Sequence, residues 1–331
     1  METIMSHVES NPEPAGPEPA LQISSETIVW RPGDPTRKDA FFILVINNPA
    51  LERPWNSGNF VPDMVGGAGS ADHSRFINSA RYVVDNLFGN TPGQAEKLLS
   101  DSPHANKIKV ASIYVRGLPP NNASALVGEE DFTSTGLLVP RRDAVPALLR
   151  TLLVNPDIVF IVSNSPTNTR AAAYSTDDND ARPGDPFTYD GQRRFHRYFH
   201  TVPGMAALHT TSDALTAAHE FGHTFSSYTN GVITDLYVDG DTAFNRKTGR
   251  PIPNVFATYK GVAYASDKER DGLGYPPEWV SYHPALVDPA QPALMDNFFF
   301  SDGFVSSKHD RITKRYILDR IEAKVFRRER T

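Results

Sequence analysis

Residues Thr211 to Thr229 have the sequence TSDALTAAHEFGHTFSSYT, which carries the most informative pattern in the chain. Leu215, Ala218, Gly222 and Phe225 recur in it at helical intervals. Thr211 or Ser212 is suited to cap the start of a helix, and Asn230-Gly231 to end it. The pattern therefore predicts a single helix with one apolar face.

Two histidines and a glutamate stand inside this predicted helix. His219 and His223 are four residues apart, so they project from the same side and can bind one metal ion together. Glu220 is offset by about 100° around the helix, where its carboxylate can reach a water on that ion without binding the metal itself. The competing interpretation is that both histidines are solvated polar residues on a surface helix.

Zinc is the metal that this pattern favours. The chain has no cysteine, so any zinc ligand has to be His, Asp or Glu. Zinc lowers the pKa of bound water from about 15.7 to about 7, and Glu220 can then accept a proton as the water attacks a carbonyl group. We therefore expect a zinc-dependent hydrolase that cleaves peptide bonds, with His219 and His223 as ligands and Glu220 as the base.

A catalytic zinc usually takes three protein ligands, so one more side chain is needed. The position six residues after His223, which is a histidine in long motifs of this type, is Thr229 here. Asp235 follows a turn just beyond the helix and is the first choice. The other candidates are Asp239, Asp241 and His283.

The segment His219-Glu220-Phe221-Gly222-His223-Thr224-Phe225 resembles the core of the bacterial IgA-peptidase-like zinc metallopeptidases. The resemblance implies an α/β, zincin-like (metzincin-type) catalytic domain, whose mixed β-sheet is flanked by helices. It also implies Asp235 as third ligand and Tyr237 beside the site, although Leu236 stands where the family has Glu. Leu294-Met295-Asp296-Asn297 is similar to the methionine-containing turn that lies beneath the metal in related zincins.

The oxyanion formed during peptide hydrolysis needs a hydrogen-bond donor. Tyr237 and Tyr228 are the candidates, because both follow the histidine motif closely in sequence. His196 and His200 are also one helical turn apart, but no acid stands between them. We therefore assign no catalytic role to that second pair.

Alternating apolar runs and helical patterns predict an α/β sheet around the motif. Residues 1–38 are expected to form a flexible Pro- and Glu-rich tail and lead-in, and residues 39–331 the catalytic domain. The terminal stretch Lys308 to Arg330 has a helical apolar stripe. The expected strands are Ala40–Ile46, Ile108–Val115 and Ile158–Val162, and the expected helices are Ser70–Phe88, capped by Ser70 or Asp72, and Arg141–Leu153.

Composition limits the partners. The formal net charge of −6 gives no general attraction to nucleic acid, and no apolar run is long enough to span a membrane. The first twenty residues lack the apolar core of a secretory signal. The expected partner is a peptide or protein substrate, while oligomeric state and compartment stay open. Two alternatives remain, namely a zinc-dependent amidase acting on a non-peptide substrate and a catalytically degenerate zincin-fold binding protein.

Overall fold

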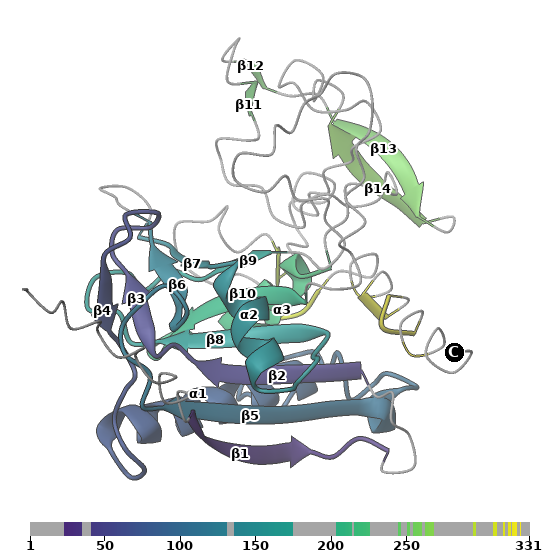
Figure 1. Ribbon diagram of the computed structural model, residues 1–331. Helices are drawn as coiled ribbons and strands as arrows, with labels where there is room; N and C mark the ends of the chain where they lie inside the picture. Colours follow the sequence, from purple (N-terminus) through teal and green to yellow (C-terminus); the bar gives the residue numbers. More distant parts are fainter. Residues whose placement is uncertain are drawn as a thin grey trace, which may run out of the picture.

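The computed structural model describes residues 23–34, 41–130, 136–174, 203–213 and 215–225. It further describes the backbone of four short strands between residues 244 and 267, and positions 294, 295, 307–309, 314, 317, 318, 320–322 and 325. Within this part the chain is a mixed α/β fold built on two mixed sheets (Figure 1). The predicted fold class is confirmed at that level.

A six-stranded sheet forms the centre, with strand order β1-β5-β2-β8-β10-β9. Its four inner strands are parallel, whereas β1 and β9 run antiparallel at the two edges. The three predicted strands match β2, β5 and β8. The bounds are β1 Ser24–Arg31, β2 Phe41–Asn47, β5 Ile108–Arg116, β8 Ile158–Ser163, β9 Ala172–Tyr174 and β10 Gly204–His209.

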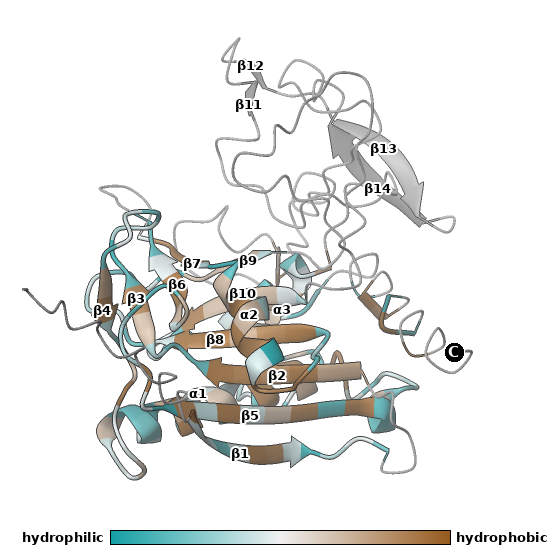
Figure 2. Cartoon of the chain, in the orientation of Figure 1, coloured by the Kyte–Doolittle hydropathy of each residue, from teal (hydrophilic) through white to brown (hydrophobic). Residues whose placement is uncertain are grey.

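Both faces of this sheet are covered, which explains why its inner strands are mostly apolar (Figure 2). On one face Ile43 and Phe160 pack with α1 (Ala71–Phe88), α3 (Thr216–His223) and Ile321. On the other face, their neighbours along each strand pack against α2 (Ala144–Thr151). Figure 1 shows α1 and α2 on opposite sides of the sheet.

Helix α1 begins where its sequence predicts. Ser70 is the N-cap, and its hydroxyl accepts a hydrogen bond of 3.2 Å from the His73 N–H. The helix ends at Gly89, whose φ of 74° is in the left-handed region that favours glycine. Helix α2 is shorter than the predicted Arg141–Leu153, because Arg141 turns away to bind the second sheet.

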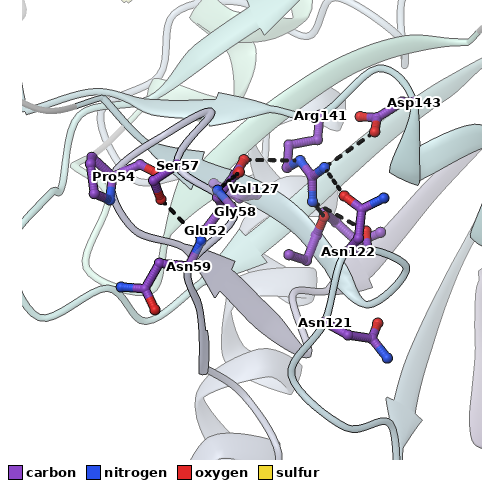
Figure 3. A network of polar contacts seen from close by, with 12 residues as sticks. Glu52, Pro54, Ser57, Gly58, Asn59, Asn121, Asn122, Val127, Arg141 and Asp143 are labelled. Atoms are coloured by element: carbon purple, nitrogen blue, oxygen red, sulfur yellow. Dashed lines mark hydrogen bonds and ion pairs between the residues drawn. The ribbon is translucent and has the colours of Figure 1, made fainter.

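The second sheet has strand order β4-β3-β6-β7 and is held to the start of α2 by a buried ion pair. Arg141 Nε lies 3.2 Å from Glu52 Oε2, and both side chains are over nine-tenths buried (Figure 3). The same guanidinium donates to Asn122 and to the Ala125 carbonyl. The bounds are β3 Ala50–Glu52, β4 Phe60–Pro62, β6 Ala125–Glu129 and β7 Leu138–Pro140.

Besides the second sheet, β9 and β10, three features lay outside the sequence-based expectations. Strand β1 falls within the segment assigned to the lead-in, yet it pairs along β5 as an edge of the central sheet. A 3-10 turn, Ala105–Lys107, precedes β5. Two short hairpins pair β11 (Phe244–Asn245) with β12 (Arg250–Pro251) and β13 (Asn254–Tyr259) with β14 (Val262–Asp267). Among the described residues, no helix is long and apolar enough to cross a membrane.

Candidate metal centre

Helix α3 carries the histidine motif and follows the last parallel strand of the central sheet. It begins at Thr216, and not at Thr211 or Ser212 as the sequence suggested. The reason is that both of those residues bond to His209: the Ser212 hydroxyl accepts from its N–H, and the Thr211 hydroxyl contacts its ring. Leu215 then takes a left-handed φ of 71°, which turns the chain into α3.

Tyr82 of α1 supplies the contact that Thr211 and Ser212 were expected to make at the start of the helix. Its hydroxyl accepts a hydrogen bond of 3.1 Å from the Thr216 N–H, which has no partner within the helix itself. Phe221 and Phe225 are buried and belong to the core cluster that packs α1 against the central sheet. Helix α3 is therefore fixed at its start and along its apolar face.

His219 and His223 approach each other through the same ring atom. Their Nε2 atoms are 3.2 Å apart, with ring centroids 4.9 Å apart and an interplanar angle of 74°. His219 is 1% exposed, so it is not a solvated residue of a surface helix, and Glu220 beside it is 3% exposed. The arrangement brings the Nε2 atoms of two imidazoles to one point.

The proton on the His219 ring is placed by a backbone carbonyl. His219 Nδ1 lies 3.0 Å from the Leu294 oxygen, and a carbonyl oxygen only accepts hydrogen bonds. Nδ1 therefore carries the proton, and Nε2 presents its lone pair toward His223. This is the arrangement that metal-binding histidines have when their second nitrogen donates to a carbonyl or carboxylate.

Burial lowers the pKa of His219 well below its ordinary value, and the nearby charge of His223 lowers it further. The hydrogen bond to Leu294 acts in the opposite direction, because it favours the protonated ring, but it does not overcome burial. His219 is therefore neutral at pH 7. A metal ligand must be neutral in this way to donate its lone pair.

The distance between the two Nε2 atoms fits a shared zinc ion. Zinc binds imidazole nitrogen at about 2.0–2.1 Å with tetrahedral geometry, which requires two ligand nitrogens about 3.3 Å apart. The observed 3.2 Å matches this value. It is also a hydrogen-bond distance, so a proton on His223 Nε2 would have to leave before the metal bound.

Met295 lies beneath the motif helix, next to the residue that contacts His219. A Cβ atom built on Gly222 would come within 2.6 Å of the Met295 sulfur and 3.3 Å of His309 Nε2. Met295 and His309 therefore pack closely against the backbone of α3 at this glycine. The resemblance to zincins implied that Met295 is part of a turn near the metal, but the sequence gave no signal for the Leu294 carbonyl or for His309.

The other predicted site residues are outside the described part of the chain. This holds for the third-ligand candidates, for both tyrosines and for the second histidine pair: Asp235, Asp239, Asp241, His283, Tyr237, Tyr228, His196 and His200. Within the described ranges, no three His, Asp or Glu side chains gather closely enough to hold a metal ion. Of the proposed metal ligands, His219 and His223 are the two that lie in the described part of the chain.

Comparison with protein-family models, with curated proteins and with solved structures finds no match to this chain.

Proposed function

We propose that this chain is a zinc-dependent peptidase of the zincin type. The observation that carries the proposal is the pair of Nε2 atoms of His219 and His223, 3.2 Å apart, with the His219 tautomer fixed by Leu294. His219 and His223 are two of the zinc ligands. Asp235 is proposed as the third and Tyr237 as the hydrogen-bond donor to the oxyanion.

Zinc bound to these residues supplies a Lewis acid that acidifies water and polarises a carbonyl group. Glu220 accepts the proton of the attacking water and passes it to the leaving amine. Its place on α3, one residue after His219 and about 100° around the helix, would let its carboxylate reach a water on the metal without binding the metal itself. Its burial favours such proton transfer, because few solvent molecules compete for the carboxylate.

The strand at the edge of the central sheet favours the proposal that the substrate is a peptide. Strand β9 is the last strand in the order of the six-stranded sheet, and it contacts α3. Its three residues, Ala172–Tyr174, are partly exposed. An extended peptide can add to such an edge through main-chain hydrogen bonds, which would align its scissile bond along the motif helix.

The test is the zinc content of the purified protein, measured by elemental analysis, together with cleavage of a mixed protein substrate. The variants are His219→Ala, His223→Ala, Asp235→Ala and Glu220→Gln, with His73→Gln as a control that also removes a partly buried histidine. We expect one zinc per chain in the wild type and in Glu220→Gln, loss of zinc in the first three, and cleavage only by the wild type and the control.

Other outcomes separate the alternatives. A zinc-loaded wild type that cleaves small amides but no peptide would favour the amidase. A wild type that takes up no zinc and cleaves nothing would favour the degenerate binding protein. Zinc retained by Asp235→Ala would move the third-ligand assignment to Asp239, Asp241 or His283.

A further inference from the structure

A buried pair of ionisable side chains, Glu96 and His309, lies next to the motif helix. Glu96 Oε2 accepts two hydrogen bonds from His309, one of 2.8 Å from its backbone N–H and one of 2.7 Å from ring Nδ1. Both side chains are at most 5% exposed. Burial opposes ionisation of Glu96, yet the hydrogen bonds and the charges of His309 and Lys314 lower its pKa below the ordinary value.

The opposite edge of the His309 ring faces α3. Its Nε2 is buried, has no hydrogen-bond partner among the described residues, and lies 3.3 Å from where a Cβ on Gly222 would be. Gly222 stands between His219 and His223 in the helix. The imidazole therefore packs on the backbone of α3 at the turn that carries both proposed ligands, and the glycine makes that approach possible.

A chain of hydrogen bonds links this pair to His219. Glu96 fixes the backbone of residues 308 and 309, and the Lys308 carbonyl accepts a hydrogen bond of 2.7 Å from the Leu294 N–H. The Leu294 carbonyl in turn accepts from His219 Nδ1. A displacement of His309 would thus move the carbonyl oxygen that accepts the hydrogen bond from His219 Nδ1.

We infer that Glu96 and His309 are positioning residues for His219, acting through the Leu294 carbonyl. The inference rests on the proposed function, because it concerns the readiness of His219 to bind zinc. Groups that orient a metal ligand typically change metal affinity by about 10- to 100-fold when they are replaced. Glu96→Gln, which removes the charge but keeps the size, and His309→Asn should each weaken zinc binding by about that factor.

The experiment measures zinc affinity by competition with a chromophoric chelator, at a temperature where circular dichroism shows every variant to be folded. It also records the tautomer of His219 in the metal-free protein by long-range 1H–15N NMR. Ile321→Val is the matched control, since Ile321 is buried in the same region but makes no polar contact with this chain of hydrogen bonds. We expect a single Nδ1-protonated tautomer in the wild type and control, and a mixture in both variants.

The outcomes distinguish the inference from the proposed function. Wild-type zinc affinity and an unchanged tautomer in Glu96→Gln and His309→Asn would overturn the positioning role and leave the peptidase proposal standing. A wild type that binds no zinc would overturn the peptidase proposal. In that case the tautomer alone decides whether the pair positions His219.

Discussion

Asp63 accepts hydrogen bonds from Ser163, Asn48 and the Asn164 N–H. Burial nevertheless raises the pKa of this carboxyl from 3.8 to about 6, because its loss of hydration outweighs those bonds. The folded state therefore binds a proton more tightly than the unfolded chain does. The stability that follows is fully present below about pH 4 and is lost as the pH rises through about 6.

We therefore expect the free energy of unfolding to fall by about 1–3 kcal/mol between pH 4 and pH 7 in the wild type, relative to Asp63→Asn. Asparagine resembles the protonated carboxyl and does not titrate in this range. Urea unfolding of both proteins at intervals of half a pH unit measures the difference. Parallel pH profiles for the two proteins would contradict the assignment.

At the scale of the element, the second sheet depends on the contact between Glu52 and Arg141. Glu52 also accepts a hydrogen bond of 2.9 Å from the Gly58 N–H, so its carboxylate joins β3, the β3–β4 turn and the start of α2 (Figure 3). Removing one partner of a buried ion pair leaves the other charge uncompensated. Breaking this buried pair should therefore lower the free energy of unfolding more than breaking an ion pair on the surface would.

Glu52→Gln should lower the free energy of unfolding by about 3 kcal/mol, because Arg141 keeps its charge within a buried environment. Asp143→Asn is the matched control. Asp143 bonds to the same guanidinium, but its side chain is 65% exposed, and its loss should cost under about 1 kcal/mol. Denaturant unfolding checks both, and equal losses would show that burial is not what makes the Glu52 contact strong.

Elements with a strong local pattern could be predicted, and elements made by tertiary contacts could not. The inner strands β2 and β8 are almost continuous apolar runs, β5 is mostly apolar, and α1 has a clear cap and an apolar stripe. Strand β9 and the strands of the second sheet other than β6 are only three residues long, too short for a period to emerge. The predicted start of α3 was wrong because the hydroxyls of Thr211 and Ser212, which can cap a helix, bond to His209 instead.

In the candidate site, too, residues with a local sequence pattern could be predicted, and residues brought together by the fold could not. The spacing of His219 and His223 indicated a shared metal, and their observed approach agrees with that prediction without testing it. The Leu294 carbonyl could not be predicted, because every residue has such a group and only the fold selects one. Glu96 and His309 are 213 residues apart, and neither carries a local signal for the other.

At the scale of the whole molecule, the C-terminal segment belongs to the same core as the sheet. Ile317, Ile321 and Val325 are at most 2% exposed and pack with α1 and the motif helix. These positions match the apolar stripe expected between Lys308 and Arg330. These C-terminal residues therefore help to stabilise the core of the central sheet, although the strands and α1 lie far from them in sequence.

Ile321→Ala should lower the free energy of unfolding by about 2–5 kcal/mol, since it removes buried methyl groups and leaves a cavity. Glu322→Ala is the neighbouring control. Its side chain is 46% exposed and pairs with His104 at 3.8 Å, so its loss should cost under about 1 kcal/mol. Thermal unfolding of the two variants compares them directly, and similar losses would show that the segment is not part of the core.

The contact between His219 and Leu294 also has a consequence for synthesis. The ribosome completes the motif helix about 70 residues before it adds Leu294, whose carbonyl fixes the His219 ring. His309, the partner of Glu96, is added 213 residues after Glu96. A nascent chain therefore holds its imidazoles without their final orientation. If the chain binds zinc, its affinity for the metal should therefore reach its final value only after Leu294 and His309 have both been added and have packed against the motif helix.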